Sequence, residues 1–217
     1  AKTSASLLYI DTLKYPNARP IEEKMPKLAK IYNKTSKRDE LVIVIQAIHI
    51  ENDTVVGFRF LTGGNGSAWY SEVNFLNDEQ INNLPDSKFV TKSVEINASQ
   101  EEIWKIITDK ENLKHLNSSF ENTNDLDQNW RKTTNFNFKY PKSGEATATF
   151  ANKMYDSYYI QNDYVFTQYN EKLLLLEDNE TNTTKMIFVC GPFLDDYELQ
   201  KNAVANWVDN VKDLASN

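Results

Sequence analysis

Hydrophobic and polar positions at the start of the chain predict a short helix. Apolar side chains recur at helical spacings after Pro20, and they are Ile21, Met25, Leu28 and Ile31. Proline lacks a backbone N–H and disrupts a helix interior, so Pro26 predicts a shortened helix or one that begins near residue 26. We therefore expect an N-terminal helix before the first long strand.

The pattern that follows predicts a β-meander. Residues 41–50, LVIVIQAIHI, are β-branched and apolar on both faces, as in a buried strand. Polar and glycine-rich turns then separate two more predicted strands, at residues 54–61 and 67–75. The polar stretch 77–87, which contains Pro85, is the best candidate for a linker.

A second set of elements is predicted after this linker. Residues 89–96 alternate polar and apolar side chains, as a half-buried strand does. Ser99 and Glu102 have the spacing of a capping box, in which each side chain hydrogen-bonds the backbone of the other residue. A short helix is therefore expected from this point, and a further short helix is expected around Leu113 and Leu116.

The remainder of the chain favours antiparallel strands followed by one long helix. Runs typical of strands lie at residues 132–140, 146–153, 158–167, 172–177 and 184–190. After Gly191 and Pro192, a helix is expected to begin at Asp195 and Asp196 and to continue for roughly 20 residues, or about 30 Å. Its apolar stripe consists of Leu199, Val204, Trp207, Val208, Val211 and Leu214.

Composition and charge narrow the class of protein. The chain has 217 residues, of which 40% are hydrophobic and 12% aromatic, which is enough for a sizeable core. Its formal net charge of −7 opposes nonspecific binding to phosphate backbones and anionic membranes. Cys190 is the single cysteine, so no intrachain disulfide can form, and we expect a cytoplasmic protein. No run approaches the roughly 18 apolar residues that span a bilayer.

Basic residues gather near the predicted N-terminal helix. Lys24, Lys27, Lys30 and Lys34 would share one face of that helix, and the pair Lys37–Arg38 follows. These residues could form a basic docking stripe. Because acidic residues at 22–23 interrupt the stripe, a solvated helix face is the favoured interpretation, and nucleic-acid binding is not expected.

The histidines and the cysteine do not predict a metal site. His49 and His115 fall in a predicted strand and a predicted helix, and neither has a second ligand at the spacing of a zinc site. Cys190 ends a β-branched strand, where a buried and unreactive thiol is expected. We therefore expect no metal and no other cofactor.

Residues 89–117, FVTKSVEINASQEEIWKIITDKENLKHLN, carry a resemblance to a known family. Together with the order of elements and with Trp207 in the last helix, they resemble the START-like superfamily, which includes polyketide cyclases and birch-pollen-allergen relatives. This resemblance implies an α+β helix-grip fold at residues 88–217, with a strongly curved antiparallel sheet around a long C-terminal helix. Residues 1–87 lie outside the resemblance, and we expect their strands to pack on this domain or to extend its sheet.

The resemblance also implies a function. Members of the superfamily hold lipids, sterols, polyketides or other apolar ligands between the sheet and the helix. For this chain it implies noncatalytic binding or carriage of an apolar or amphipathic small molecule. The ligand-binding residues expected on the strands and the last helix are Tyr158, Tyr164, Phe166, Phe188, Leu199, Ala203 and Trp207. An ordinary set of core and surface aromatics remains the alternative interpretation of these rings.

Two other functions are compatible with the same resemblance. One is a protein-interaction module that resembles the heat-shock ATPase activators, although their Gly-Trp pair at the start of the last helix is replaced here by residues 195–197, DDY. The other is an enzyme of the cyclase or dehydratase type, in which polar groups such as Tyr158, Asp163 or Tyr164 would converge on one reactive atom. No catalytic constellation is visible in the sequence, so the expectation leans against an enzyme.

Overall fold

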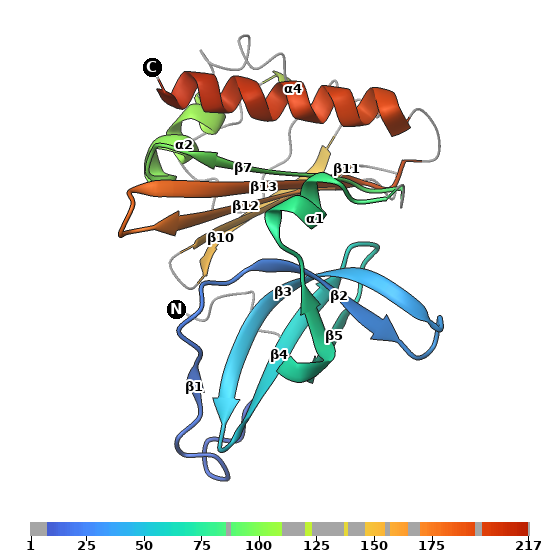
Figure 1. The fold of residues 1–217 in the computed structure, drawn as a ribbon, viewed down its shortest axis with the longest axis vertical. Coiled ribbons are helices and arrows are strands. Elements are labelled where there is room, and N and C mark those ends of the chain that lie inside the picture. Colours follow the sequence, from blue (N-terminus) through green and yellow to red (C-terminus); the bar gives the residue numbers. More distant parts are fainter. Residues whose placement is uncertain are drawn as a thin grey trace. The chain divides into compact units, whose positions relative to one another are not determined.

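The fold comes from a computed structural model, which divides the chain into two compact units (Figure 1). The first unit comprises residues 1–77 with 154–157, and the second comprises residues 78–153 with 158–217. The structure describes residues 8–85, 88–109, 120–122, 137–138, 146–154, 157–164, 170–193 and 197–216. Only the backbone is described at residues 108, 120–122, 137–138, 146–154 and 162–164.

The first unit is an antiparallel sheet with strand order β5-β4-β3-β2-β6, and β1 pairs with the far end of β3. Its elements are β1 (Arg19–Pro20), β2 (Lys27–Asn33), β3 (Arg38–Ile50), β4 (Asp53–Phe60), β5 (Asn65–Trp69), the 3-10 helix η1 (Tyr70–Glu72) and β6 (Val73–Phe75). One face of the sheet packs into a core with Met25, Val44 and Val56, each fully buried. The meander predicted from residue 41 onward is confirmed, except that η1 divides its third strand into β5 and β6.

The predicted N-terminal helix is wrong, because residues 27–33 form β2. This strand pairs with β3 on one side and with β6 on the other, and both of its faces contain buried side chains. Leu28 and Ile31 are both buried although they lie on opposite faces of the strand. A strand that is apolar on both faces loses its alternation, so its residues can match a helical spacing by chance.

The second unit contains an antiparallel sheet with order β10-β11-β12-β13-β7, a two-stranded β8-β9 pair and three described helices. Its elements are α1 (Asp78–Asn82), β7 (Val90–Ile96), α2 (Gln100–Thr108), β8 (Phe120–Asn122), β9 (Asn137–Phe138), β10 (Ala146–Met154), β11 (Ser157–Tyr164), β12 (Asn170–Asp178), β13 (Thr183–Gly191) and α4 (Tyr197–Ser216).

Helix α4 lies along one face of this sheet (Figure 1), and its apolar stripe joins the sheet and α2 in a single core. Val204, Val208 and Val211 are the buried residues of α4 in that core. The capping box before α2 is confirmed: the Ser99 hydroxyl accepts from the Glu102 N–H at 3.1 Å, and the Glu102 carboxylate accepts from the Ser99 N–H at 2.8 Å. These bonds satisfy backbone donors that the first turn of a helix leaves open.

The stretch predicted as a linker contains α1, which packs on β7. Ile81 is buried, and its carbonyl accepts a hydrogen bond of 2.6 Å from the Thr91 hydroxyl. The Asn82 side chain bonds both the N–H and the carbonyl of Ser93. Polar composition suggested a linker, whereas these polar groups in fact hold α1 against the edge strand of the sheet.

The fold class is α+β, with antiparallel sheets and a long C-terminal helix, as expected. The first unit has a sheet of its own, so the expectation that its strands extend the second sheet is wrong for the strands that the structure describes. The further short helix around Leu113 and Leu116 lies outside the described residues, as does most of the run 132–140. No helix in the described ranges is long and apolar enough to cross a membrane.

Candidate functional site

The side of the second sheet that meets α2 and α4, here called the inner face, is the candidate site. Alternation along the strands places every second side chain on this face. Its buried members are Val90, Ile96, Tyr158, Ile160, Leu173, Leu175, Met186, Phe188 and Cys190. Ile160, Leu173 and Phe188 stand in register across three neighbouring strands. The inner face is therefore a continuous apolar wall.

Two aromatic pairs connect this wall to the helices. The Trp104 ring of α2 stacks on the Tyr158 ring of β11, with centroids 4.9 Å apart and an interplanar angle of 16°. The Trp207 ring of α4 lies against the Phe188 ring of β13, with centroids 5.1 Å apart and an angle of 40°. Each pair places a large flat surface from a helix against the sheet.

The Tyr158 hydroxyl adds a polar group at one end of the wall. It donates a hydrogen bond of 2.7 Å to a carboxylate oxygen of Glu101, which lies in the first turn of α2. The ring of Tyr158 is buried while its hydroxyl reaches this polar partner. Such an arrangement combines an apolar surface with a group that can orient a polar atom.

Glu171 adds a second polar group, within the wall itself. Its position in β12 is in register with Cys190 of β13, and alternation puts it on the same face as Leu173 and Leu175. Burial raises the pKa of the Glu171 carboxyl to about 8, because the ionised form loses its hydration. At neutral pH the protonated carboxyl is therefore favoured, and it can both donate and accept a hydrogen bond.

The structure describes the side chains of five of the seven residues that the sequence predicts to bind a ligand. Tyr158 and Phe188 are buried on the inner face, and Trp207 is half-buried in contact with Phe188. Ala203 is half-buried on α4. Leu199 is 62% exposed, so it does not line the wall. Phe166 lies outside the described residues, as does the side chain of Tyr164 at the end of β11.

Sequence reasoning missed three members of the site. Trp104, Glu101 and Glu171 were not among the ligand-binding residues expected from the sequence. The structure begins β12 at Asn170, so Glu171 belongs to the strand. Alternation counted back from Leu175 and Leu173 would have placed Glu171 on the same face, and that signal was available.

The histidines, the cysteine and Asp163 lie in different parts of the chain. Within the described ranges, no group of three His, Cys, Asp or Glu side chains is arranged to hold a metal ion. His49 is in the first unit, where its Nδ1 lies 2.8 Å from the Thr54 hydroxyl. Cys190 is a fully buried thiol, as expected. His115 and the side chain of Asp163 lie outside the described residues.

Comparisons with known proteins give no family for this chain. No family model matches it, and no curated protein does. Among solved structures, an uncharacterised protein from Bacillus thuringiensis is similar at 15% identity over 59% of this chain and 99% of its own, with a TM-score of 0.39.

Two further solved structures are similar at the same level. The Aha1 dimer from Colwellia psychrerythraea is 15% identical over 58% of this chain and 95% of its own, with a TM-score of 0.39. NdmA from Pseudomonas putida with caffeine is 10% identical over 88% of this chain and 80% of its own, with a TM-score of 0.38. Similarity of this size defines neither the fold nor the function of the chain.

Proposed function

We propose that the second unit is a START-like helix-grip domain that binds an apolar or amphipathic small molecule between the inner face and α4. The observation that carries the proposal is the pairing of Phe188 with Trp207 and of Trp104 with Tyr158, each joining a helix to the sheet. Ligand sites in proteins are lined mainly by apolar and aromatic side chains, with a few polar groups that fix orientation.

The polar groups of the wall define the kind of molecule that fits. The Tyr158 hydroxyl and the Glu171 carboxyl stand on a mainly apolar surface, on which Lys92 is in register with Phe188. An uncharged ligand with one or two oxygen atoms could bond these groups without bringing a charge into the core. A sterol, a polyketide or the acyl part of a lipid has this chemistry, and the proposed binding needs no catalytic step.

The first test is native mass spectrometry of gently purified protein, followed by solvent extraction of whatever remains bound. We expect a discrete additional mass that the solvent removes and that partitions as an apolar molecule. A clean protein mass, together with no thermal shift in the presence of cholesterol, methyl oleate or an uncharged aromatic polyketide, would overturn the proposal.

A matched pair of variants on α4 ties the binding to the wall. Trp207→Ala removes the ring that contacts Phe188, whereas Leu199→Ala removes an exposed side chain from the same helix. We expect Trp207→Ala to abolish the bound mass or the thermal shift, and Leu199→Ala to retain both. Equal loss in the two variants would show that the ligand does not lie against this wall.

A further inference from the structure

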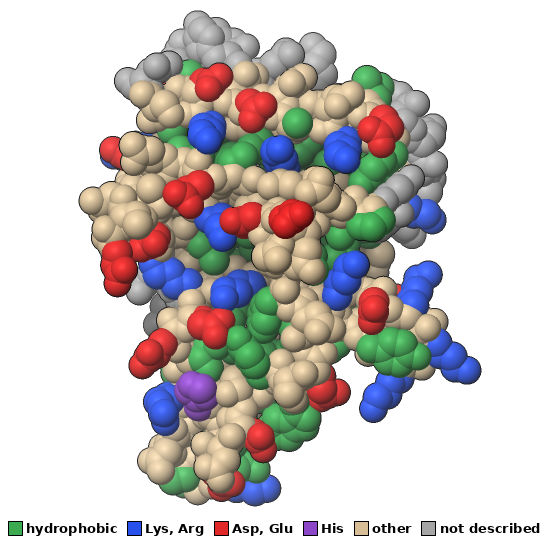
Figure 2. Space-filling view, in the orientation of Figure 1, with side chains coloured by type: hydrophobic (Ala, Val, Ile, Leu, Met, Phe, Trp, Pro, Cys, Tyr) green, Lys and Arg blue, Asp and Glu red, His purple; other side chains and the backbone are tan. Residues whose placement is uncertain are grey.

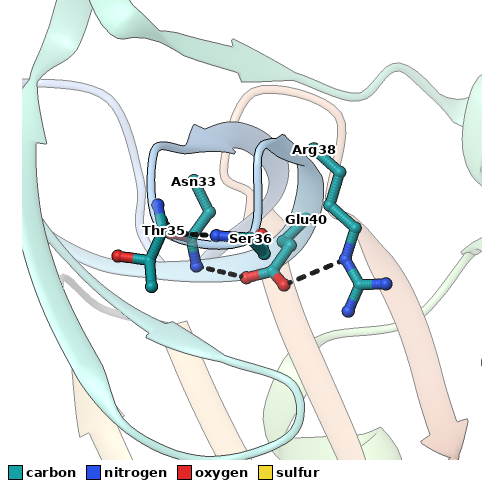
Figure 3. Close-up of polar contacts among 5 residues, drawn as sticks. All are labelled: Asn33, Thr35, Ser36, Arg38 and Glu40. Atoms are coloured by element: carbon teal, nitrogen blue, oxygen red, sulfur yellow. Dashed lines mark hydrogen bonds and ion pairs between the residues drawn. The ribbon is translucent and has the colours of Figure 1, made fainter.

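The β2–β3 hairpin of the first unit has a locally fixed tip (Figure 3). The Asn33 side-chain oxygen accepts from the backbone N–H groups of Thr35 and Ser36, at 2.9 and 3.4 Å. The Asn33 carbonyl also accepts from the Lys37 N–H at 2.8 Å, which closes the turn. Lys37 has a φ of 56°, a left-handed conformation that this closed turn requires. The tip is therefore preorganised.

Glu40 braces the same tip from β3 (Figure 3). Its two carboxylate oxygens accept from the Asn33 amide at 2.8 Å and from the Arg38 side chain at 3.4 Å. The hydrogen bond from Asn33 is the largest of the effects that lower the pKa of Glu40. The negative charge of Glu40 is thus held by contacts within the hairpin. It neutralises the charge of Arg38 more than it neutralises the charges of the neighbouring lysines.

The rest of the tip carries three lysines around an exposed ring, together with one exposed acid, Asp39, which is in register with Tyr32. Lys34 and Lys37 are exposed and Lys30 is half-exposed, and no ion pair of these three side chains occurs within the part of the chain that the structure describes. Tyr32 is 56% exposed and shares a strand face with Lys30, because the two are separated by one residue. Figure 2 shows Lys and Arg side chains gathered around a hydrophobic side chain on this hairpin.

The edge of β2 is open at its last two residues, Tyr32 and Asn33. Strand β6 pairs with β2 only at Ala29, Lys30 and Ile31, so within the described residues no strand covers the outer edge of β2 beyond that point. An uncovered strand edge can accept an extended segment of another chain through backbone hydrogen bonds. An extended partner would then lie next to Tyr32 and the lysines.

We propose that this basic tip, formed by Lys30, Tyr32, Lys34 and Lys37, docks an acidic, extended segment of a partner protein. Carboxylates of the segment would pair with the three ammonium groups, and one apolar or aromatic side chain would pack on the Tyr32 ring. Charge complementarity selects an acidic partner, since the hairpin is basic in a protein of net charge −7. A long polyanion would extend beyond this small tip, and the net negative charge of the rest of the protein would repel it.

The test uses the full chain and a fluorescein-labelled peptide of Glu residues around one central Phe. A matched peptide carries Gln in place of every Glu. We expect the Glu peptide to bind and the Gln peptide to bind far more weakly, and we expect the Glu peptide to lose affinity as salt rises from about 50 to about 300 mM. Equal binding of the two peptides would overturn the proposal.

Two triple variants locate the binding. Replacing Lys30, Lys34 and Lys37 by Gln removes three charges from the tip, and replacing Lys105, Lys201 and Lys212 by Gln removes the same charge from α2 and α4 of the second unit. We expect the first variant to weaken peptide binding by about five- to tenfold and the second to leave it nearly unchanged. Equal weakening would show a general charge effect and would refute the assigned surface.

A single variant and a vesicle control complete the test. We expect Tyr32→Ser to weaken the Phe-containing peptide and to leave a peptide with Ala in place of Phe unaffected, because only the former uses the ring. Vesicles of phosphatidylserine and phosphatidylcholine give the competing outcome. In that outcome, the protein binds these vesicles more tightly than the Glu peptide and loses that binding when Lys30, Lys34 and Lys37 become Gln. That result would show that the tip binds a membrane surface, and it would overturn the proposal of a protein partner.

Discussion

At the residue scale, Glu171 is a buried acid on the inner face, and its ionisation should affect stability. Its pKa is about 8 in the folded protein, well above the ordinary value of 4.5. Between these values the folded state keeps a proton that the unfolded state has released. The protonated Glu171 carboxyl therefore contributes fully to the free energy of unfolding below about pH 4.5. As pH rises from there to about 8 this contribution is lost, by about 1.4 kcal/mol per pH unit at most.

The measurement is the free energy of unfolding from urea melts across this pH range, compared between the wild type and Glu171→Gln. Glutamine has nearly the same shape and does not titrate, so the difference between the two proteins isolates this carboxyl from all other groups. We expect the variant to gain stability relative to the wild type as pH rises. Parallel pH profiles would mean that Glu171 is ionised or solvated in the folded protein.

Residue positions could be predicted from the sequence where packing decides them, and not where a strand boundary does. Phe188 lies well inside β13, so its place on one face follows from alternation alone. Glu171 lies beside a boundary, one residue before the run 172–177 that the sequence predicts as a strand. Leu199 was expected to face inward, but it is one of the more exposed apolar residues because the buried stripe of α4 follows Val204, Val208 and Val211.

At the element scale, α1 is held to the second sheet by several polar contacts, and the two made by the Asn82 side chain give a sharp test. Asn82→Ala removes the two bonds to the Ser93 backbone, of 2.8 and 3.1 Å, and leaves those backbone groups without a partner. Loss of a partner from half-buried groups costs about 1–3 kcal/mol. We expect a destabilisation in this range in thermal or chemical melts.

The neighbouring Asn83 provides the control for this measurement. Asn83 is exposed, and its side chain bonds only the Glu79 carbonyl one turn back in the chain, at 2.9 Å. Asn83→Ala should change stability by less than about 0.5 kcal/mol, as surface substitutions usually do. If the two variants were equally stable, α1 would not be an integral part of the second unit.

Elements were predicted well where local signals and long-range pairing agree. The capping box before α2 is a local signal, and the structure reproduces both of its hydrogen bonds. The strand β2 shows the opposite case: its apolar spacing matched a helix, but it pairs with β3 along its whole length and with β6 at Ala29, Lys30 and Ile31. Such pairing depends on residues distant in the sequence, which a local pattern does not contain.

At the scale of the whole molecule, the α+β class follows from the order of elements, because runs of strands before a long helix leave few other arrangements. The division between the two units was harder to predict. A polar segment marks a linker only when its side chains face water, and in α1 they bond to β7 instead. Composition does not distinguish these cases, since both need Asn, Asp and Ser.

The net charge makes a prediction of its own for the whole chain. With a net charge of −7, the protein should repel phosphate backbones in spite of its basic hairpin. We expect no gel shift of duplex DNA by up to about 10 µM protein at about 150 mM salt, because nonspecific binding depends on releasing many counterions and the hairpin offers few cations.

The hairpin variant decides what a contrary result would mean. Half-shift of the DNA below about 1 µM protein, abolished when Lys30, Lys34 and Lys37 become Gln, would make the tip a nucleic-acid site. A shift that survives those substitutions would place the contact elsewhere in the chain. If the DNA shows no gel shift and the Glu peptide binds, the tip selects a short acidic segment over a polyanion. A short segment contacts only the lysines of the tip, and salt screens it from the net negative charge of the rest of the protein.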